Sequence, residues 1–159
     1  MSISVICVGK LREKYFQDAA DEYLKRLSRL TPVTVIELPD EKEPANPTDA
    51  LCRQVMDREG EKILSRIGPQ DHVIALCINA RQYPSEELAR RLSDLFIQGK
   101  SRITFVIGGS LGLSEAVLRR ADERLSMSAM TFPHQLARVM LLEQLFRAAK
   151  INAGERYHK

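Results

Sequence analysis

Short runs of β-branched and apolar residues alternate along this chain with longer amphipathic stretches, and this alternation constrains the fold more than any other feature. The clearest apolar runs cover residues 3–8, 33–38, 72–78 and 102–107. Strands that alternate with helices are typical of α/β proteins with a largely parallel sheet. The sequence therefore predicts an α/β fold of five strands and five helices.

The amphipathic stretches place apolar residues at helical spacing and predict helices at 13–30, 49–66, 84–98 and 115–124, with a last helix that ends at Ile151. Ser114 is a plausible N-cap for the fourth of them. Residues 125–128 form a short segment before the last helix. Prolines and acidic residues fill positions 39–49, so we expect an exposed loop there, either a plain connector or a mobile one.

Length and composition favour one folded domain over residues 1–159. A chain of 159 residues with 44% hydrophobic residues buries enough surface for a core without disulfide or metal support. The three cysteines, Cys7, Cys52 and Cys77, show no paired spacing, which indicates a reducing, cytoplasmic compartment. The first nine residues resemble neither an export signal nor a membrane span.

Three histidines, His72, His134 and His158, are scattered along the chain and do not have the spacing of a zinc site, so we expect no metal. His72 opens a predicted strand, which favours a structural role. His134 follows Pro133 at a helix start, where capping and catalysis are both open. His158 lies in a polar C-terminal tail, which can have a function only if another surface binds and orders it.

The net charge of +3 is small for a nucleic-acid-binding protein, but its distribution is uneven. From Phe132 onward there are five basic residues and two acidic ones, whereas the preceding part of the chain is balanced. The whole excess therefore lies on the last helix and the tail, and dimerisation would double it.

Gly108–Gly112 follow a predicted strand and precede a helix, where glycines let the backbone approach a ligand closely. The glycine spacing fits neither a dinucleotide-binding motif nor a phosphate-binding loop of the Walker type. This loop is the best candidate for a ligand site, with a purely structural turn as the alternative.

The same five residues also have the form of a nucleophile elbow, with Ser110 followed in order by Asp122 and His134. An elbow starts its helix at the serine, whereas the cap signal here comes later, at Ser114. A serine hydrolase is therefore an alternative with weaker support.

Apolar residues cover more than one face of the last helix, from Leu136 to Ala149. A surface helix usually buries a single stripe, so this helix should be covered on two sides. The simplest interpretation is a core helix that also forms a homodimer interface. A helix fully buried within one chain remains the alternative.

Taken in order, several motifs resemble the RlmH family, the SPOUT-class methyltransferases of large-subunit ribosomal RNA. The resemblance covers the whole chain and rests on the following motifs: Val8-Gly9-Lys10, Ile107-Gly-Gly-Ser-Leu-Gly-Leu113, Leu125-Ser126, Met130-Thr-Phe-Pro-His134, Arg138, Glu143-Gln144, Phe146-Arg-Ala148 and Tyr157-His158. It implies a SPOUT-type parallel sheet with helices on both faces and a C-terminal trefoil knot. It also implies S-adenosylmethionine-dependent methylation of N3 of a pseudouridine in 23S rRNA, by a homodimer that acts on the assembled ribosome.

The resemblance also implies the site residues. Those expected to line the cofactor pocket are Leu76, Gly108, Met127, Ser128, Ala129, Met130, Thr131 and Phe132. Tyr157 and His158 would reach the partner's pocket, with His158 handling the proton and Tyr157 orienting the substrate. Arg138 would anchor RNA or cofactor, and His134 is the alternative to His158. A non-catalytic ribosome-binding module is the remaining rival.

Overall fold

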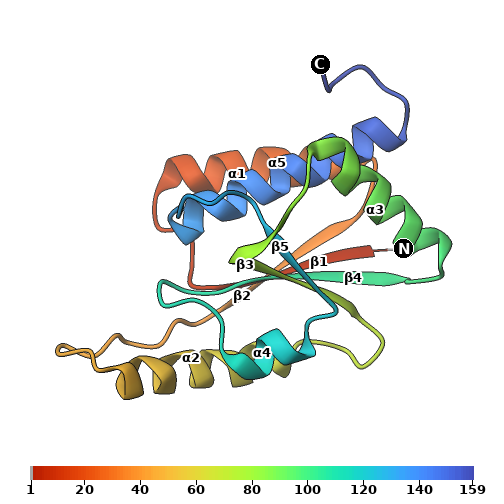
Figure 1. Cartoon of the computed structure of the whole chain (residues 1–159). Helices are drawn as coiled ribbons and strands as arrows, with labels where there is room; N and C mark the ends of the chain where they lie inside the picture. The colour runs from red at the N-terminus through yellow and green to blue at the C-terminus, as the bar shows by residue number, and fades with distance from the viewer. Residues whose placement is uncertain (1) are drawn as a thin grey trace.

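The computed structural model describes residues 2–159, and within them five strands alternate with five helices from the first strand to the last helix (Figure 1). The strands are β1 (Ser2–Val8), β2 (Val33–Leu38), β3 (His72–Gln82), β4 (Arg102–Ile107) and β5 (Glu123–Ser126). The helices are α1 (Lys14–Leu27), α2 (Asp49–Leu64), α3 (Ser85–Ile97), α4 (Glu115–Arg120) and α5 (His134–Asn152). The predicted α/β class is confirmed.

All five strands belong to one parallel sheet in the order β2-β1-β4-β3-β5. The interior strand β1 pairs with β2 on one side and with the central strand β4 on the other, and six of its seven residues are buried. Burial on both faces explains why β1 and β4 are apolar almost throughout rather than alternating.

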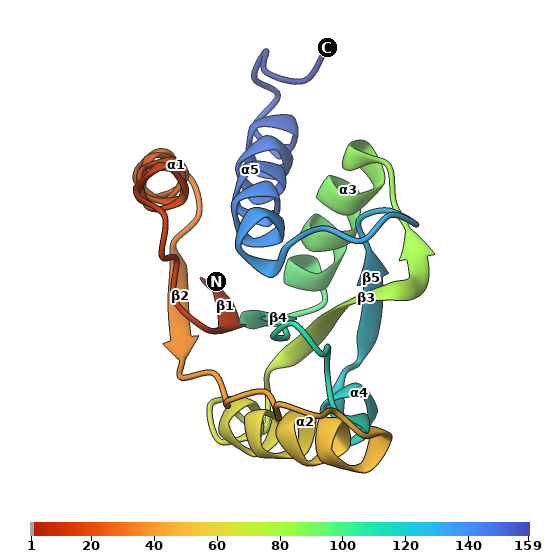
Figure 2. The same ribbon diagram turned by 90° about the vertical axis from the view of Figure 1, so that its left-hand side faces the viewer.

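Helices cover both faces of the sheet. One face carries α1, α5 and α3, and the other carries α2 and α4, as the two views show (Figures 1 and 2). Alternate strand residues point to opposite layers, so Phe105 packs in the core beneath α5 while Val106 packs in the smaller core above α2. None of the helices among residues 2–159 is long and apolar enough to cross a bilayer.

Three predicted boundaries are wrong in an instructive way. The fourth helix ends at Arg120 instead of continuing to residue 124, because Glu123–Ser126 pair with β3 as strand β5. The third strand continues past residue 78 to Gln82, after an irregularity in which Leu76 and Arg81 both face Leu125. The first helix ends at Leu27, where the Ser28 hydroxyl turns back to the Lys25 carbonyl.

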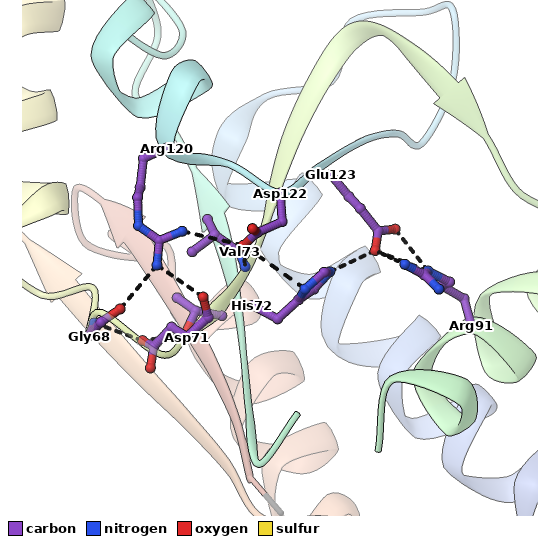
Figure 3. Close-up of polar contacts among 9 residues, drawn as sticks. Gly68, Asp71, His72, Val73, Arg91, Arg120, Asp122 and Glu123 are labelled. Carbon is purple, nitrogen blue, oxygen red and sulfur yellow. Dashed lines mark hydrogen bonds and ion pairs between the residues drawn. The ribbon is translucent and has the colours of Figure 1, made fainter. Parts of the chain in front are cut away.

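A polar network joins the amino ends of β3 and β5 to the helices that flank them (Figure 3). His72 Nε2 lies 2.6 Å from Glu123 Oε1, and Arg91 on α3 approaches the same carboxylate. Asp122 accepts a hydrogen bond of 2.8 Å from the Val73 amide. These contacts support the structural role that the sequence predicted for His72.

The network continues toward α4 and β4. The Arg120 guanidinium donates to the carbonyl oxygens of Gly68 and Asp71, at 3.1 and 3.0 Å. The buried Asp71 carboxylate accepts from the Thr104 hydroxyl at 3.0 Å and pairs with Arg102. Each charged group named here has a partner. We call these residues together the amino-edge network: Asp71, His72, Arg91, Arg102, Arg120, Asp122 and Glu123.

Candidate functional site

A cavity of about 870 Å³ lies at the carboxyl ends of β3 and β4. Its walls are the end of β3, the loop between β4 and α4, the segment after β5 and the first turn of α5. Cavities at this edge of a parallel sheet are the usual ligand sites of α/β proteins, and a mostly apolar wall suits an organic ligand. The glycine-rich loop predicted as a ligand site is part of this wall.

The loop Gly108–Gly112 folds back on itself so tightly that glycine is required. A Cβ atom on Gly108 would lie 2.8 Å from the carbonyl carbon and oxygen of Gly112. Gly112 has a φ of +92°, and its amide donates to the Gly109 carbonyl at 3.0 Å. The wall of the cavity is therefore formed by backbone at this point.

Glu59 on α2 lies directly beneath the loop and is only 4% exposed. A Cβ atom on Gly109 would lie 3.1 and 3.2 Å from its two carboxylate oxygens. The carboxylate accepts a hydrogen bond from the Glu41 amide at 3.1 Å, and burial raises its pKa. Glu59 thus joins the loop after β2 to the glycine loop, a role that the charged pattern of α2 does not reveal.

The segment after β5, residues 127–133 without Ala129, forms another part of the cavity wall. The Ser126 hydroxyl donates to the Ser128 carbonyl, and the Met130 amide donates to the Ser128 hydroxyl, both at 3.0 Å. Seven of the eight residues predicted for the cofactor pocket line the cavity: Leu76, Gly108, Met127, Ser128, Met130, Thr131 and Phe132. Ala129 does not line it.

The irregular part of β3 supplies another wall that the sequence did not indicate. Cys77, Ile78 and Asn79 line the cavity between the two β3 residues that face Leu125. Burial raises the pKa of the Cys77 thiol, and the positive charge of Arg124 acts in the opposite direction. All three cysteines are free thiols, in keeping with the prediction from their spacing.

His134 begins α5 and lines the cavity. Burial lowers the pKa of its imidazole, and the neighbouring positive charge of Arg138 lowers it further. At neutral pH the ring is therefore uncharged and able to accept a proton.

Arg138 lies one turn further along α5 and is absent from the cavity wall. Its side chain is buried, with Nη1 at 2.5 Å from Glu37 Oε2 and Nη2 donating to the Gly9 carbonyl at 2.8 Å. Its Nε has no hydrogen-bond partner among residues 2–159. In this chain Arg138 joins α5 to the ends of β1 and β2.

Tyr157 and His158 also lie away from the cavity of their own chain. The Tyr157 hydroxyl donates to Glu143 at 3.2 Å, and its ring packs edge-on against Phe146. His158 Nε2 lies 2.7 Å from Glu86 Oε1 on α3. Between this tail and His134 stands the whole of α5, about 28 Å at the usual helical rise.

The serine hydrolase alternative is not supported by these positions. Ser110 is exposed and its hydroxyl donates to Glu43. Asp122 precedes β5 and belongs to the amino-edge network, at the other end of the strands from Ser110. The three residues of the supposed triad therefore do not meet.

The basic excess of the C-terminal part is mostly paired within the chain. Arg138 pairs with Glu37, Arg147 with Glu143, and Lys150 with Glu155. Arg156 and Lys159 are exposed. Among residues 2–159 there is no group of three or more histidine, cysteine or carboxylate side chains that could hold a metal ion.

Comparison with known proteins gives the class to which this fold and site belong. Residues 1–158 match the family described as predicted SPOUT methyltransferase, and the chain belongs to that family. Two relatives are similar over their full length and that of this chain: proteins of Clostridium novyi, 55% identical, and of Bifidobacterium animalis subsp. lactis, 54% identical. A third, from Listeria monocytogenes serotype 4b, is 54% identical over the same span. Each is named ribosomal RNA large subunit methyltransferase H.

Proposed function

We propose that this protein is an S-adenosylmethionine-dependent methyltransferase that methylates N3 of a pseudouridine in 23S rRNA on the assembled ribosome. The observation that carries the proposal is the cavity of backbone and apolar groups at the carboxyl edge of the sheet, in a member of the SPOUT methyltransferase family. The names of its full-length relatives support ribosomal RNA as the substrate class. The proposal places the protein in the cytoplasm, with residues 1–159 acting as one domain.

The residues of the cavity suit the methyl donor. An apolar wall with exposed backbone groups can enclose an adenine ring and hydrogen-bond its edge. Leu76, Gly108 and the segment 127–132 would hold the donor, and Glu59 would support the glycine loop from below. When bound, S-adenosylmethionine supplies an electrophilic methyl group.

The protein's own contribution to such a reaction is alignment and removal of the weakly acidic N3 proton. His158 would accept the proton and Tyr157 would orient the base. Arg138 is the residue that the resemblance assigns to anchoring RNA or the donor, although in this chain it is buried against Glu37 and the Gly9 carbonyl. His134 is a second candidate for the proton acceptor, because it lines the cavity of its own chain and its lowered pKa keeps it neutral.

The position of the tail supports a homodimer. Tyr157 and His158 pack at the far end of α5 from their own cavity, so they would complete the site of a second copy. Leu136 and Met140 on α5 are half-buried and belong to neither apolar core that residues 2–159 of their own chain form, which supports a second face that a partner covers. Pairing would also bring together the exposed basic residues of two tails. The trefoil knot expected for this family is part of the same proposal.

The test is to incubate the protein with labelled S-adenosylmethionine and ribosomes that lack the modification, and then to locate label in 23S rRNA. We expect incorporation into one pseudouridine, and much less with free 23S rRNA. His158→Ala should lower the rate in a protein that remains dimeric, and His134→Ala tests the second acceptor. Ribosome binding without incorporation, and without thermal stabilisation by the donor, would instead indicate a non-catalytic binding module.

A further inference from the structure

The cavity wall contains a single strongly charged side chain. Among residues 2–159, Arg124 is the only lysine, arginine, aspartate or glutamate that lines it. The remaining wall consists of glycine backbone, apolar and small polar side chains, and the neutral His134. A guanidinium in such surroundings makes one part of the cavity selective for an anionic group.

The Arg124 guanidinium is also the least engaged in its neighbourhood. Its one hydrogen bond among residues 2–159 is a long contact of 3.4 Å from Nη2 to the Leu118 carbonyl. By contrast Arg91 pairs with Glu123, and Arg120 contacts Asp122 and two carbonyl groups (Figure 3). Because an arginine carries five N–H donors in a planar fork, Arg124 keeps most of them for a ligand.

The strand places this group at a defined side of the cavity. Leu125 belongs to the core under α3 and α5, so Arg124 beside it points to the opposite layer, where it meets Leu118 of α4. His134 belongs to α5 and so approaches from the other layer. The cation therefore stands on the α4 side of the cavity.

We propose that Arg124 binds the α-carboxylate of the methyl donor's amino-acid group and thereby orients the donor, an inference that rests on the proposed function. Besides its α-ammonium group, the donor carries one carboxylate and a cationic sulfur. A guanidinium attracts the former in a two-point hydrogen-bonded pair and repels the latter. The carboxylate end thus lies toward α4, and the sulfur lies away from Arg124.

The experiment measures binding of two ligands by calorimetry at low salt. S-adenosylhomocysteine carries the amino-acid carboxylate, and 5′-methylthioadenosine lacks it. Arg124→Gln should weaken S-adenosylhomocysteine roughly tenfold, in the range of a lost charge-assisted pair, and leave 5′-methylthioadenosine unchanged. Arg124→Lys should fall between, because it keeps the charge and loses the fork.

Arg119→Gln is the matched control, since Arg119 is an exposed arginine on α4 that pairs with Glu115 and does not line the cavity. It should bind both ligands like the parent protein. Equal weakening of both ligands in Arg124→Gln would overturn the proposal. The proposal would also be overturned if Arg124→Gln bound both ligands like the parent protein. If that variant then had a raised KM for ribosomes and a smaller salt dependence of this KM, Arg124 would be assigned to an RNA phosphate. Failure of the parent protein to bind S-adenosylhomocysteine would instead overturn the proposed function.

Discussion

The two ends of the parallel sheet differ in whether their charged side chains are paired. At the amino ends of β3, β4 and β5, Asp71, His72, Asp122 and Glu123 all have hydrogen-bond or ion-pair partners (Figure 3). At the carboxyl ends, the cavity is walled by glycine backbone and apolar side chains, and its one arginine has no acidic partner among residues 2–159.

This difference separates a structural site from a binding site in the same sheet. A network in which every charged group is paired has no free donor or acceptor for a ligand. Its partly buried members hold strands and helices together. A wall of unengaged donors and apolar surface has the opposite properties. Perturbed titratable groups alone do not make this distinction, because they occur at both edges: Glu123 at one and His134 at the other.

The largest predicted effect comes from adding one methyl group to the carboxyl edge. Gly108→Ala would place its Cβ against the backbone of Gly112 at 2.8 Å, so the loop must move. We expect the affinity for S-adenosylhomocysteine to fall at least about a hundredfold, equivalent to roughly 2.7 kcal/mol. Calorimetry measures this directly.

Gly99→Ala is the control for Gly108→Ala. Gly99 also needs a positive φ, of +83°, but has no atom within 4 Å of an added Cβ, and it lies in the turn between α3 and β4. It should lose about 1 kcal/mol of stability through backbone strain and keep its ligand affinity. If Gly108→Ala bound the ligand as tightly as the parent, the backbone wall would not be the binding surface.

The amino edge should respond to mutation in stability rather than in binding. Glu123→Ala leaves Arg91 and His72 without their carboxylate partner at a position where the Glu123 side chain is only 16% exposed. We expect the free energy of unfolding in urea to fall by about 2 kcal/mol, with ligand affinity unchanged.

Glu115→Ala provides the comparison for Glu123→Ala. Glu115 also pairs with an arginine, Arg119, but its side chain is 90% exposed. Exposed pairs of this kind contribute about 0.5 kcal/mol or less, so this variant should be nearly as stable as the parent. Equal losses in the two variants would show that burial does not set the strength of the amino-edge network.

The sequence was most informative where local pattern decides structure. The apolar runs predicted β2 and β4 with their observed bounds. In β4, burial on both faces leaves a continuous apolar signal. The glycine loop was predicted as a ligand site from its own pattern. It lines one cavity together with most of the segment 127–132, which the family resemblance assigned to the cofactor pocket.

Features that depend on pairing between distant segments were missed. The first two residues of β5, Glu123 and Arg124, were predicted as the end of a helix and the last two as part of a short segment, because these four residues form a strand only by pairing with β3. The polar residues at the end of β3 hid the irregularity that brings Cys77 and Asn79 into the cavity wall. Glu59 acquires its role only from segments folded against it, including the distant glycine loop.

The two edges should lose stability in different pH ranges. The pKa of His134 is lowered below 6.5 by burial and by Arg138, so the folded protein resists a proton that the unfolded chain accepts. Its contribution is present above pH 6.5 and is lost as the pH falls below that value. His134→Gln should therefore flatten the stability profile in this range.

Glu123 acts at lower pH. Burial raises its pKa, but hydrogen bonds from Arg91 and His72 outweigh burial and hold the net pKa below 4.5. Its contribution is present above pH 4.5 and is lost as the pH falls below that value, so Glu123→Gln should flatten only this lower part. Urea midpoints measured from about pH 7 to pH 3.5 test both variants. If the plot of urea midpoint against pH showed only one change of slope, and either variant removed it, the two edges would not lose stability in separate pH ranges.

The smallest predicted effect is again in the glycine loop, where side chain and backbone can be compared at neighbouring positions. Ser110 lines the cavity, yet it is exposed and its hydroxyl bonds outward to Glu43. Because the wall is formed by backbone there, Ser110→Ala should change the affinity for S-adenosylhomocysteine by less than about twofold and stability by less than about 0.5 kcal/mol. Methyl transfer to ribosomes should continue at the parental rate. If Ser110→Ala lost activity and a serine-reactive phosphonate labelled the parent protein, Ser110 would be a nucleophile after all. The comparison with Gly108→Ala would then fail, because it depends on the backbone and not the side chain forming the wall at Ser110.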